Sequence, residues 1–146
     1  MADIRVQIAP FDLAAEMAAV SVAGVGGVGC FVGVVRGGDG LLALELEHYP
    51  GMTERAMTTI AAESERRWSL AACTVVHRVG RLAVGEGIVL VLAAAAHRGA
   101  ALEATGFLID WLKTRAPFWK REWFSNGTNR WVEARGTDEA ATERWG

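Results

Sequence analysis

The chain has 146 residues, a formal net charge of −2 and 51% apolar residues. Its length and composition are those of one globular domain covering residues 1–146, and they exclude a disordered chain. General nucleic-acid binding needs a basic surface, so we expect no nucleic-acid partner.

The location of the protein is inferred from its N-terminal residues and its cysteines. Residues 1–5 contain no basic region followed by a long apolar run, and the most apolar stretch, residues 87–96, is too short to cross a bilayer. Cys30 and Cys73 each lie in an apolar run, so we expect buried thiols in a reducing compartment. These features predict a cytoplasmic protein that does not associate with a membrane.

The first half of the chain is predicted to form strands and helices in alternation. Strands are expected at residues 3–9, 30–35 and 42–49, and helices at residues 12–20 (capped by Asp12) and 53–68. The turn Gly37–Gly40 precedes the third strand, so we expect the second and third strands to pair as a hairpin. In the third strand Leu42, Leu44, Leu46 and His48 should share one face.

The second half of the chain continues the mixture of strands and helices. Strands are expected at residues 73–79 and 88–96, a well-buried helix at 99–115, and a final hairpin from 119–124 and 130–134. Pro117 ends the long helix, because proline removes a hydrogen-bond donor and biases Ala116 away from helix. The polar tail 136–146 can form a short helix. The order of elements predicts an α+β fold, with helices covering one side of a sheet.

Lysines are scarce in this chain, which has thirteen arginines and only Lys113 and Lys120 as lysines. A lysine amine, unlike a guanidinium, can lose its proton near neutral pH when it is crowded or desolvated. Pro117 forbids one continuous helix between the two lysines, so the chain folds back and can direct both amines into one pocket. The alternative is a pair of surface lysines in an arginine-biased chain.

Nearby cations are expected to tune these amines. Crowding by Arg36, Arg98 and Arg121 would lower the pKa of whichever lysine is buried. His97-Arg98-Gly99 lies where a buried strand ends and a helix begins, so free backbone N–H groups and the guanidinium can hold an anion there. The alternative is an ordinary turn with an exposed arginine.

Two other motifs are interpreted without a ligand. The letters of Gly24–Gly29 match a dinucleotide-binding loop, but a helix precedes them and a strand follows, which reverses the order that phosphate binding needs. We interpret this segment as a flexible loop. His48, His77 and His97 lack the close paired spacing of a zinc site, so no metal is expected.

These residues, taken together, resemble the molybdopterin synthase large-subunit family. The matching stretches are residues 31–36, 46–52, 77–82, 84–86, 97–98, 109–113, 116–122 and 130–133. They follow the family's order from about Val28 to Arg135. The turn Gly37–Gly40 is shorter than the family's usual loop, and Trp123–Asn129 also departs from the pattern.

The resemblance implies a fold, an activity and partners. The fold is an α/β hammerhead with a smaller antiparallel β subdomain, in a homodimer that binds one small ubiquitin-like sulfur-carrier subunit at each end. The carrier's C-terminal Gly-Gly tail, as a thiocarboxylate, would supply two sulfurs to cyclic pyranopterin monophosphate and form the molybdopterin dithiolene. The resemblance implies no cofactor.

The resemblance also implies which residues do the chemistry. Lys113 and Lys120 match the catalytic positions. The substrate-binding positions match Val34, Val35, Arg36, His97, Arg98, Arg121, Glu122 and Arg135, the last reaching a neighbouring subunit's pocket.

Two other functions remain open at this point. One is a sulfurtransferase that carries a persulfide on Cys30 or Cys73, which requires an exposed cysteine of low pKa. The other is a non-catalytic module of the same fold that only binds the carrier protein.

Overall fold

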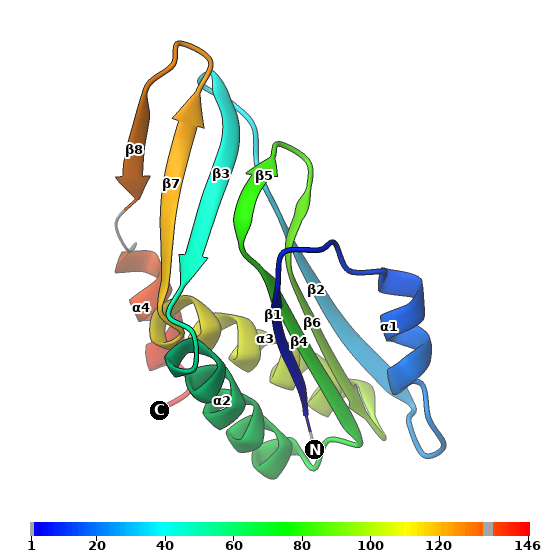
Figure 1. Ribbon diagram of the computed structural model, residues 1–146. Helices are drawn as coiled ribbons and strands as arrows, with labels where there is room; N and C mark the ends of the chain where they lie inside the picture. Colours follow the sequence, from blue (N-terminus) through cyan, green and yellow to red (C-terminus); the bar gives the residue numbers. More distant parts are fainter. Residues whose placement is uncertain (1, 133–135) are drawn as a thin grey trace.

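The computed structural model describes residues 2–132 and 136–146, in which two four-stranded sheets meet (Figure 1). The larger sheet has the order β1 (Asp3–Gln7), β4 (Ala72–Arg78), β6 (Gly87–Ala95), β2 (Gly27–Val34). The smaller sheet has the order β5 (Gly80–Ala83), β3 (Leu41–His48), β7 (Phe118–Phe124), β8 (Asn129–Val132). All neighbouring strands are antiparallel except β1 and β4. The predicted α+β class is confirmed.

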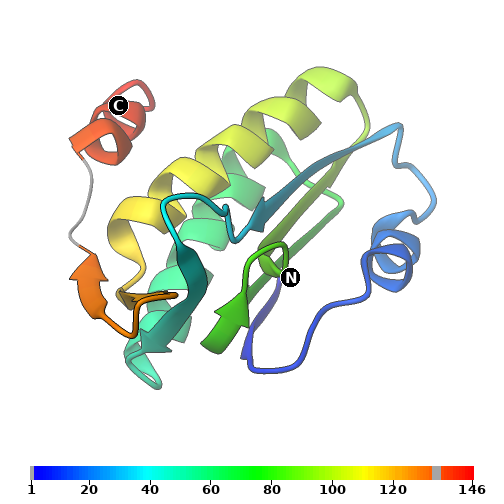
Figure 2. The same ribbon diagram turned by 90° about the horizontal axis from the view of Figure 1, so that it is seen from above.

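Helices cover both faces of the larger sheet. The helices are α1 (Leu13–Val20), α2 (Met52–Trp68), α3 (Arg98–Arg115) and α4 (Gly136–Glu143). Figure 2 shows α2 and α3 on one side of the sheet and α1 on the other. The expectation of helices on one side only is therefore wrong, because Val20 of α1 packs against Leu90 and Leu92 on the second face.

Strand β6 runs through the centre of the core. Val89 and Val91 belong to the cluster packed under α2 and α3, whereas Leu90 and Leu92 belong to the cluster under α1. Because both faces of β6 are covered, its sequence is apolar throughout instead of alternating.

The predicted hairpin between the second and third strands is wrong. Strand β2 pairs with β6, and β3 pairs with β5 and β7, so the turn Gly37–Gly40 carries the chain from one sheet to the other. The half-polar alternation of β3 suits the smaller sheet, which is covered less completely. A register shift between Leu41 and Ala43 buries Ala43 and leaves Leu42 51% exposed, contrary to the face predicted for Leu42.

The glycine-rich segment lies directly against α3 and is not a loop throughout. Strand β2 begins at Gly27, three residues earlier than predicted. A Cβ atom on Gly29 would lie 2.1 Å from Thr105 Oγ1 and 2.4 Å from the carbonyl oxygen of Ala101. Glycine here allows the strand and the helix to approach more closely than any side chain would permit.

One short strand was not predicted. Strand β5 occupies four residues that we expected to be a connection. Such a short strand has too few residues to show alternation.

The polar tail contains the short helix α4, as predicted. Arg144 and Trp145, which follow this helix, both donate hydrogen bonds to Asp110 of α3. None of the helices in the described part of the chain combines the length and apolar character needed to span a membrane.

Candidate functional site

A proline bend separates the two lysines, and a buried threonine fixes that bend. Ala116 has extended backbone angles (φ −80°, ψ 122°), as expected for a residue before proline. The Pro117 carbonyl accepts a hydrogen bond of 2.8 Å from Thr53 Oγ1, which itself accepts one of 2.9 Å from the backbone N–H of Tyr49. The bend is thereby tied to the start of α2 and the end of β3.

Both lysines lie near one buried histidine. His77 of β4 is 3% exposed, and its ring stacks on Phe118 at a centroid distance of 3.7 Å. Burial, with smaller effects from the charges of Lys113, Lys120 and His48, lowers the pKa of His77 to about 3. Phe118 precedes Lys120 by two residues in β7, so the stack places the start of the strand that carries Lys120 against His77. We call His48, His77, Lys113 and Lys120 the lysine cluster.

The alternation of β7 and β3 explains the composition of the lysine cluster. Phe118 is paired with His48, and Lys120 with Leu46, so these side chains share one face of the smaller sheet. His48 Nε2 lies 3.5 Å from Glu54 Oε2 at the start of α2. The sequence did not identify His48 or His77 as site residues, although its alternation placed His48 on the same face of β3 as Leu44 and Leu46.

Strand β7 divides the residues that were grouped with Lys120. Glu122 lies on the same face as Lys120 and accepts a hydrogen bond of 2.8 Å from Arg130 Nε. Arg121 points to the other face, where its guanidinium lies 4.2 Å from the ring centroid of Trp131. Among the described residues, the buried Nε of Arg121 has no hydrogen-bond partner. The structure thus brings Glu122, but not Arg121, to the face that carries Lys120.

His97 and Arg98 lie at the opposite end of α3 from Lys113. His97 is the N-cap and Arg98 the first helical residue, and both are exposed. Fifteen residues separate Arg98 from Lys113, which is about 22 Å along a helix. Within one chain the expectation that Arg98 crowds the lysines is therefore wrong, because the rigid helix α3 holds the two positions apart.

The substrate-binding positions after β2 lie partly inside the core. Val35 is 2% exposed and packs in a cluster with Leu46, the strand partner of Lys120. Val34 and Arg36, on either side of it, are exposed. Arg135 lies outside the described residues.

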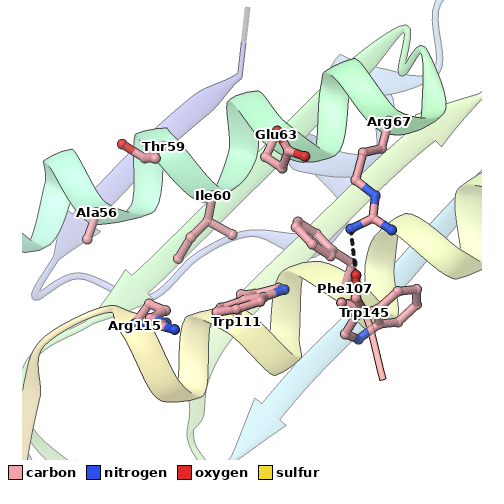
Figure 3. Close-up of a pocket in the computed structure, with 10 residues that line it drawn as sticks. Ala56, Thr59, Ile60, Glu63, Arg67, Phe107, Trp111, Arg115 and Trp145 are labelled. Atoms are coloured by element: carbon pink, nitrogen blue, oxygen red, sulfur yellow. Dashed lines mark hydrogen bonds between the residues drawn. The ribbon is translucent and has the colours of Figure 1, made fainter. Parts of the chain in front are cut away.

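A groove between α2 and α3 is separate from these residues. It has a volume of about 430 Å³, and its walls include Phe107, Trp111 and Trp145 (Figure 3). Arg67 on its rim donates a hydrogen bond of 3.2 Å to the carbonyl oxygen of Trp145. None of the predicted site residues lines this groove.

The two cysteines differ in exposure. Cys73 is buried as expected, and burial is the main reason that its pKa is raised to about 12. Cys30 is exposed, so the expectation of a buried thiol is wrong there, because Cys30 lies on the edge strand β2. Partial burial still raises the pKa of Cys30. Neither thiol has the low pKa that a persulfide carrier needs.

An α+β chain with two lysines beside a buried neutral imidazole, and with a cationic helix end elsewhere, has the groups of an enzyme subunit for an anionic substrate. Residues 6–115 match the family described as MoaE protein. The chain therefore belongs to the MoaE family, and its predicted resemblance to the molybdopterin synthase large subunit is confirmed.

Individual relatives cover almost the whole chain. A molybdopterin synthase catalytic subunit from Mesorhizobium japonicum is 53% identical, over 97% of this chain and 92% of its own length. One from Pseudomonas aeruginosa is 51% identical over 97% of each chain. The solved structure of a molybdopterin biosynthesis MoaE protein from Burkholderia ambifaria is 52% identical, with a TM-score of 0.86 over 99% of this chain and 98% of that one.

Proposed function

We propose that this chain is the catalytic subunit of a molybdopterin synthase and acts as a sulfurtransferase. It would move two sulfurs from the C-terminal thiocarboxylate of a small ubiquitin-like carrier to cyclic pyranopterin monophosphate. The observation that carries the proposal is the position of Lys113 and Lys120 on either side of a fixed bend, near one uncharged imidazole. Free thiols at Cys30 and Cys73 support a cytoplasmic location.

Lys113 and Lys120 would divide the proton and charge transfers. Lys113, when deprotonated, can act as general base or acid during attack by the thiocarboxylate, or can accept the carrier's acyl group. Lys120 would stabilise developing oxyanions. Glu122, on the same face as Lys120, would orient the substrate.

His97 and Arg98, as phosphate-binding residues, would have to come from a second copy of the chain. Arg98 lies about 22 Å along α3 from Lys113, farther than a single pterin phosphate reaches. In a two-fold dimer, the His97-Arg98 end of one copy can meet the lysine cluster of the other. This arrangement agrees with the homodimer that the resemblance implies, and it leaves each lysine cluster open to one carrier tail.

The proposed function is tested by mixing the purified chain with thiocarboxylated carrier and substrate, and measuring molybdopterin. We expect Lys113→Arg to lower kcat by about 100-fold or more, because arginine keeps the charge but has no titratable amine. Arg115→Lys, an exposed change in the same helical turn, is the matched control and should stay within about twofold.

Two results would contradict this assignment at different levels. Near wild-type activity of Lys113→Arg would refute the proton-transfer role of that amine. A folded wild-type chain that binds the carrier but forms no molybdopterin would refute catalysis itself, and would favour the non-catalytic carrier-binding module.

A further inference from the structure

The groove between α2 and α3 keeps the facing sides of these two helices apart along part of their length. Its volume is about 430 Å³, and Trp145, which follows α4, forms part of its wall (Figure 3). Beneath the groove both helices pack on the larger sheet, through residues such as Ile60 of α2 and Leu108 of α3. On the side away from the sheet, the segment after α4 is what joins the two helices.

Trp145 contacts both helices across the groove. On the α2 side, its carbonyl oxygen accepts a hydrogen bond of 3.2 Å from Arg67 Nη1, and its ring meets the ring of Trp68 edge-on at a centroid distance of 5.7 Å. On the α3 side, its ring meets Phe107 edge-on at 5.8 Å. It also lies over Gly106, where a Cβ atom would be 3.4 Å from Trp145 Cζ2. One residue thus ties α2 to α3.

A single carboxylate on α3 accepts the polar groups of this segment. Asp110 Oδ2 accepts a hydrogen bond of 2.7 Å from Trp145 Nε1 and one of 2.6 Å from Arg144 Nη2. The Asp110 side chain is only 15% exposed, so these charge-assisted bonds are partly shielded from water. From Gly106 to Asp110 the contacts span a full turn of α3, so they oppose rotation of the helix about its axis.

Rotation of α3 would displace Lys113, which lies three residues after Asp110. A side-chain atom about 6 Å from a helix axis moves by about 1 Å when the helix turns by about 10°. A misplacement of about 1 Å at a reacting group can lower a rate by about 100-fold. After Lys113 comes the bend at Pro117, which Thr53 ties to α2. Lys113 therefore lies between two ties, one at Asp110 and one at Pro117.

We propose that Trp145 is a positioning residue for Lys113, and that it acts through Asp110 and the orientation of α3. Arg144 supports it at Asp110, and Arg67 supports it at the Trp145 carbonyl. We call Arg67, Asp110, Arg144 and Trp145 the tryptophan clamp. The catalytic meaning of this inference rests on the proposed function, which assigns the reacting amine to Lys113, whereas the effect of the clamp on α3 does not.

Removing the clamp should change α3 near Lys113 before any substrate is added. In Trp145→Ala and in Asp110→Ala, the backbone amides of residues 110–116 should exchange with deuterium about tenfold faster than in the wild type, because this part of the helix loses its outer support. The amides of residues 100–104 should change by less than about twofold. Hydrogen–deuterium exchange with mass spectrometry measures both segments. Trp145→Phe keeps an aromatic ring and loses only the Nε1 bond, so its exchange should lie between the two.

The same variants should lose turnover and keep their substrate affinity. In the sulfur-transfer assay, kcat should fall about tenfold in Trp145→Ala, with KM for carrier and for pterin substrate within about threefold. Val20→Ala is the matched control, because it destabilises the core under α1, on the face of the larger sheet away from α3. Its melting temperature should fall while its kcat stays within about twofold.

The outcomes separate the clamp from the proposed function. Wild-type exchange of residues 110–116 in folded Trp145→Ala overturns the proposal, as does faster exchange with unchanged kcat. An equal loss of kcat in Val20→Ala overturns it too, since lower stability alone would then explain the effect. If Trp145→Ala does not fold, Trp145→Phe and Asp110→Ala decide in the same way. If the wild type forms no molybdopterin but the exchange differs as expected, the proposed function fails and the hold of the clamp on α3 remains.

Discussion

Thr53 connects three parts of the fold through one hydroxyl group. The hydroxyl donates to the Pro117 carbonyl at the bend and accepts from the Tyr49 N–H after the end of β3, while Thr53 itself is the second residue of α2. Its side chain is fully buried, so the hydroxyl itself is shielded from water. The position of the bend therefore depends on a polar group in the core, and such groups are costly to leave unpaired.

Replacing this hydroxyl should destabilise the protein measurably. Thr53→Val keeps the shape of the side chain but removes the hydroxyl that bonds the Pro117 carbonyl and the Tyr49 N–H, so the free energy of unfolding should fall by about 1–3 kcal/mol. Urea denaturation measures the change. Thr58→Val, which removes an exposed hydroxyl bonded only to the Glu54 carbonyl, is the control and should change stability by less than about 0.5 kcal/mol. Equal losses in the two variants would contradict this account of Thr53.

His77 should make the protein sensitive to acid. Its pKa is about 6.5 in the unfolded chain and is lowered to about 3 in the fold, mainly by burial. Below pH 6.5 the unfolded chain binds a proton that the folded chain does not, so stability is present above this pH and is lost as pH falls toward 3. In His77→Asn, urea midpoints should fall less steeply over this range than in the wild type. His97→Asn, at an exposed site, should behave like the wild type; a wild-type slope in His77→Asn would contradict the prediction.

At the scale of elements, the sequence predicted the long helices and the central strands but not how the strands pair. Periodicity over α2 and α3 and the apolar runs of β4 and β6 are local features, so their bounds agree with the prediction to within a few residues. The pairing of β2 with β6 instead of β3 is a long-range choice. It is decided by which strand has an apolar surface to share, and a turn signal such as Gly37–Gly40 does not contain that information.

The contact between β2 and α3 should be intolerant of a single methyl group. Gly29→Ala would place a Cβ atom within 2.4 Å of the backbone oxygen of Ala101, so the strand or the helix must move. We expect a loss of about 1–3 kcal/mol in the free energy of unfolding, measured by thermal or urea denaturation. Gly99→Ala, in the first turn of α3 with open space around it, should be neutral or slightly stabilising. A tolerated Gly29→Ala would show that the two elements are less closely packed than described.

At the scale of the whole molecule, the candidate site was predictable only in part. The two lysines stood out because the chain uses arginine elsewhere, and Pro117 between them indicated a bend. His77 could not be recognised, because its contact with Phe118 joins residues 41 positions apart through two different sheets. The distance between Arg98 and Lys113 was equally hidden, since a family resemblance names residues without saying which copy of the chain supplies them.

A site built from two copies predicts complementation between inactive variants. Lys113→Ala and Arg98→Ala should each be inactive, but refolding an equal mixture should recover about a quarter of wild-type activity, because half of the dimers contain one intact site. Mixing Lys113→Ala with Lys120→Ala is the matched control and should recover nothing, since both lysines come from the same copy. Molybdopterin formation measures each mixture. Activity in the control, or none in the test mixture, would contradict a shared site.

Both lysines lie in the short segment around the Pro117 bend, and this placement also limits side reactions. An activated acyl group that reaches this chain finds side-chain amines only there, because every other cation is an arginine, a histidine or the α-amino group. Isopeptide bonds between the carrier and the rest of this chain therefore cannot form, because no other lysine is present. Any such adduct found by peptide mapping should fall within the segment from Lys113 to Lys120.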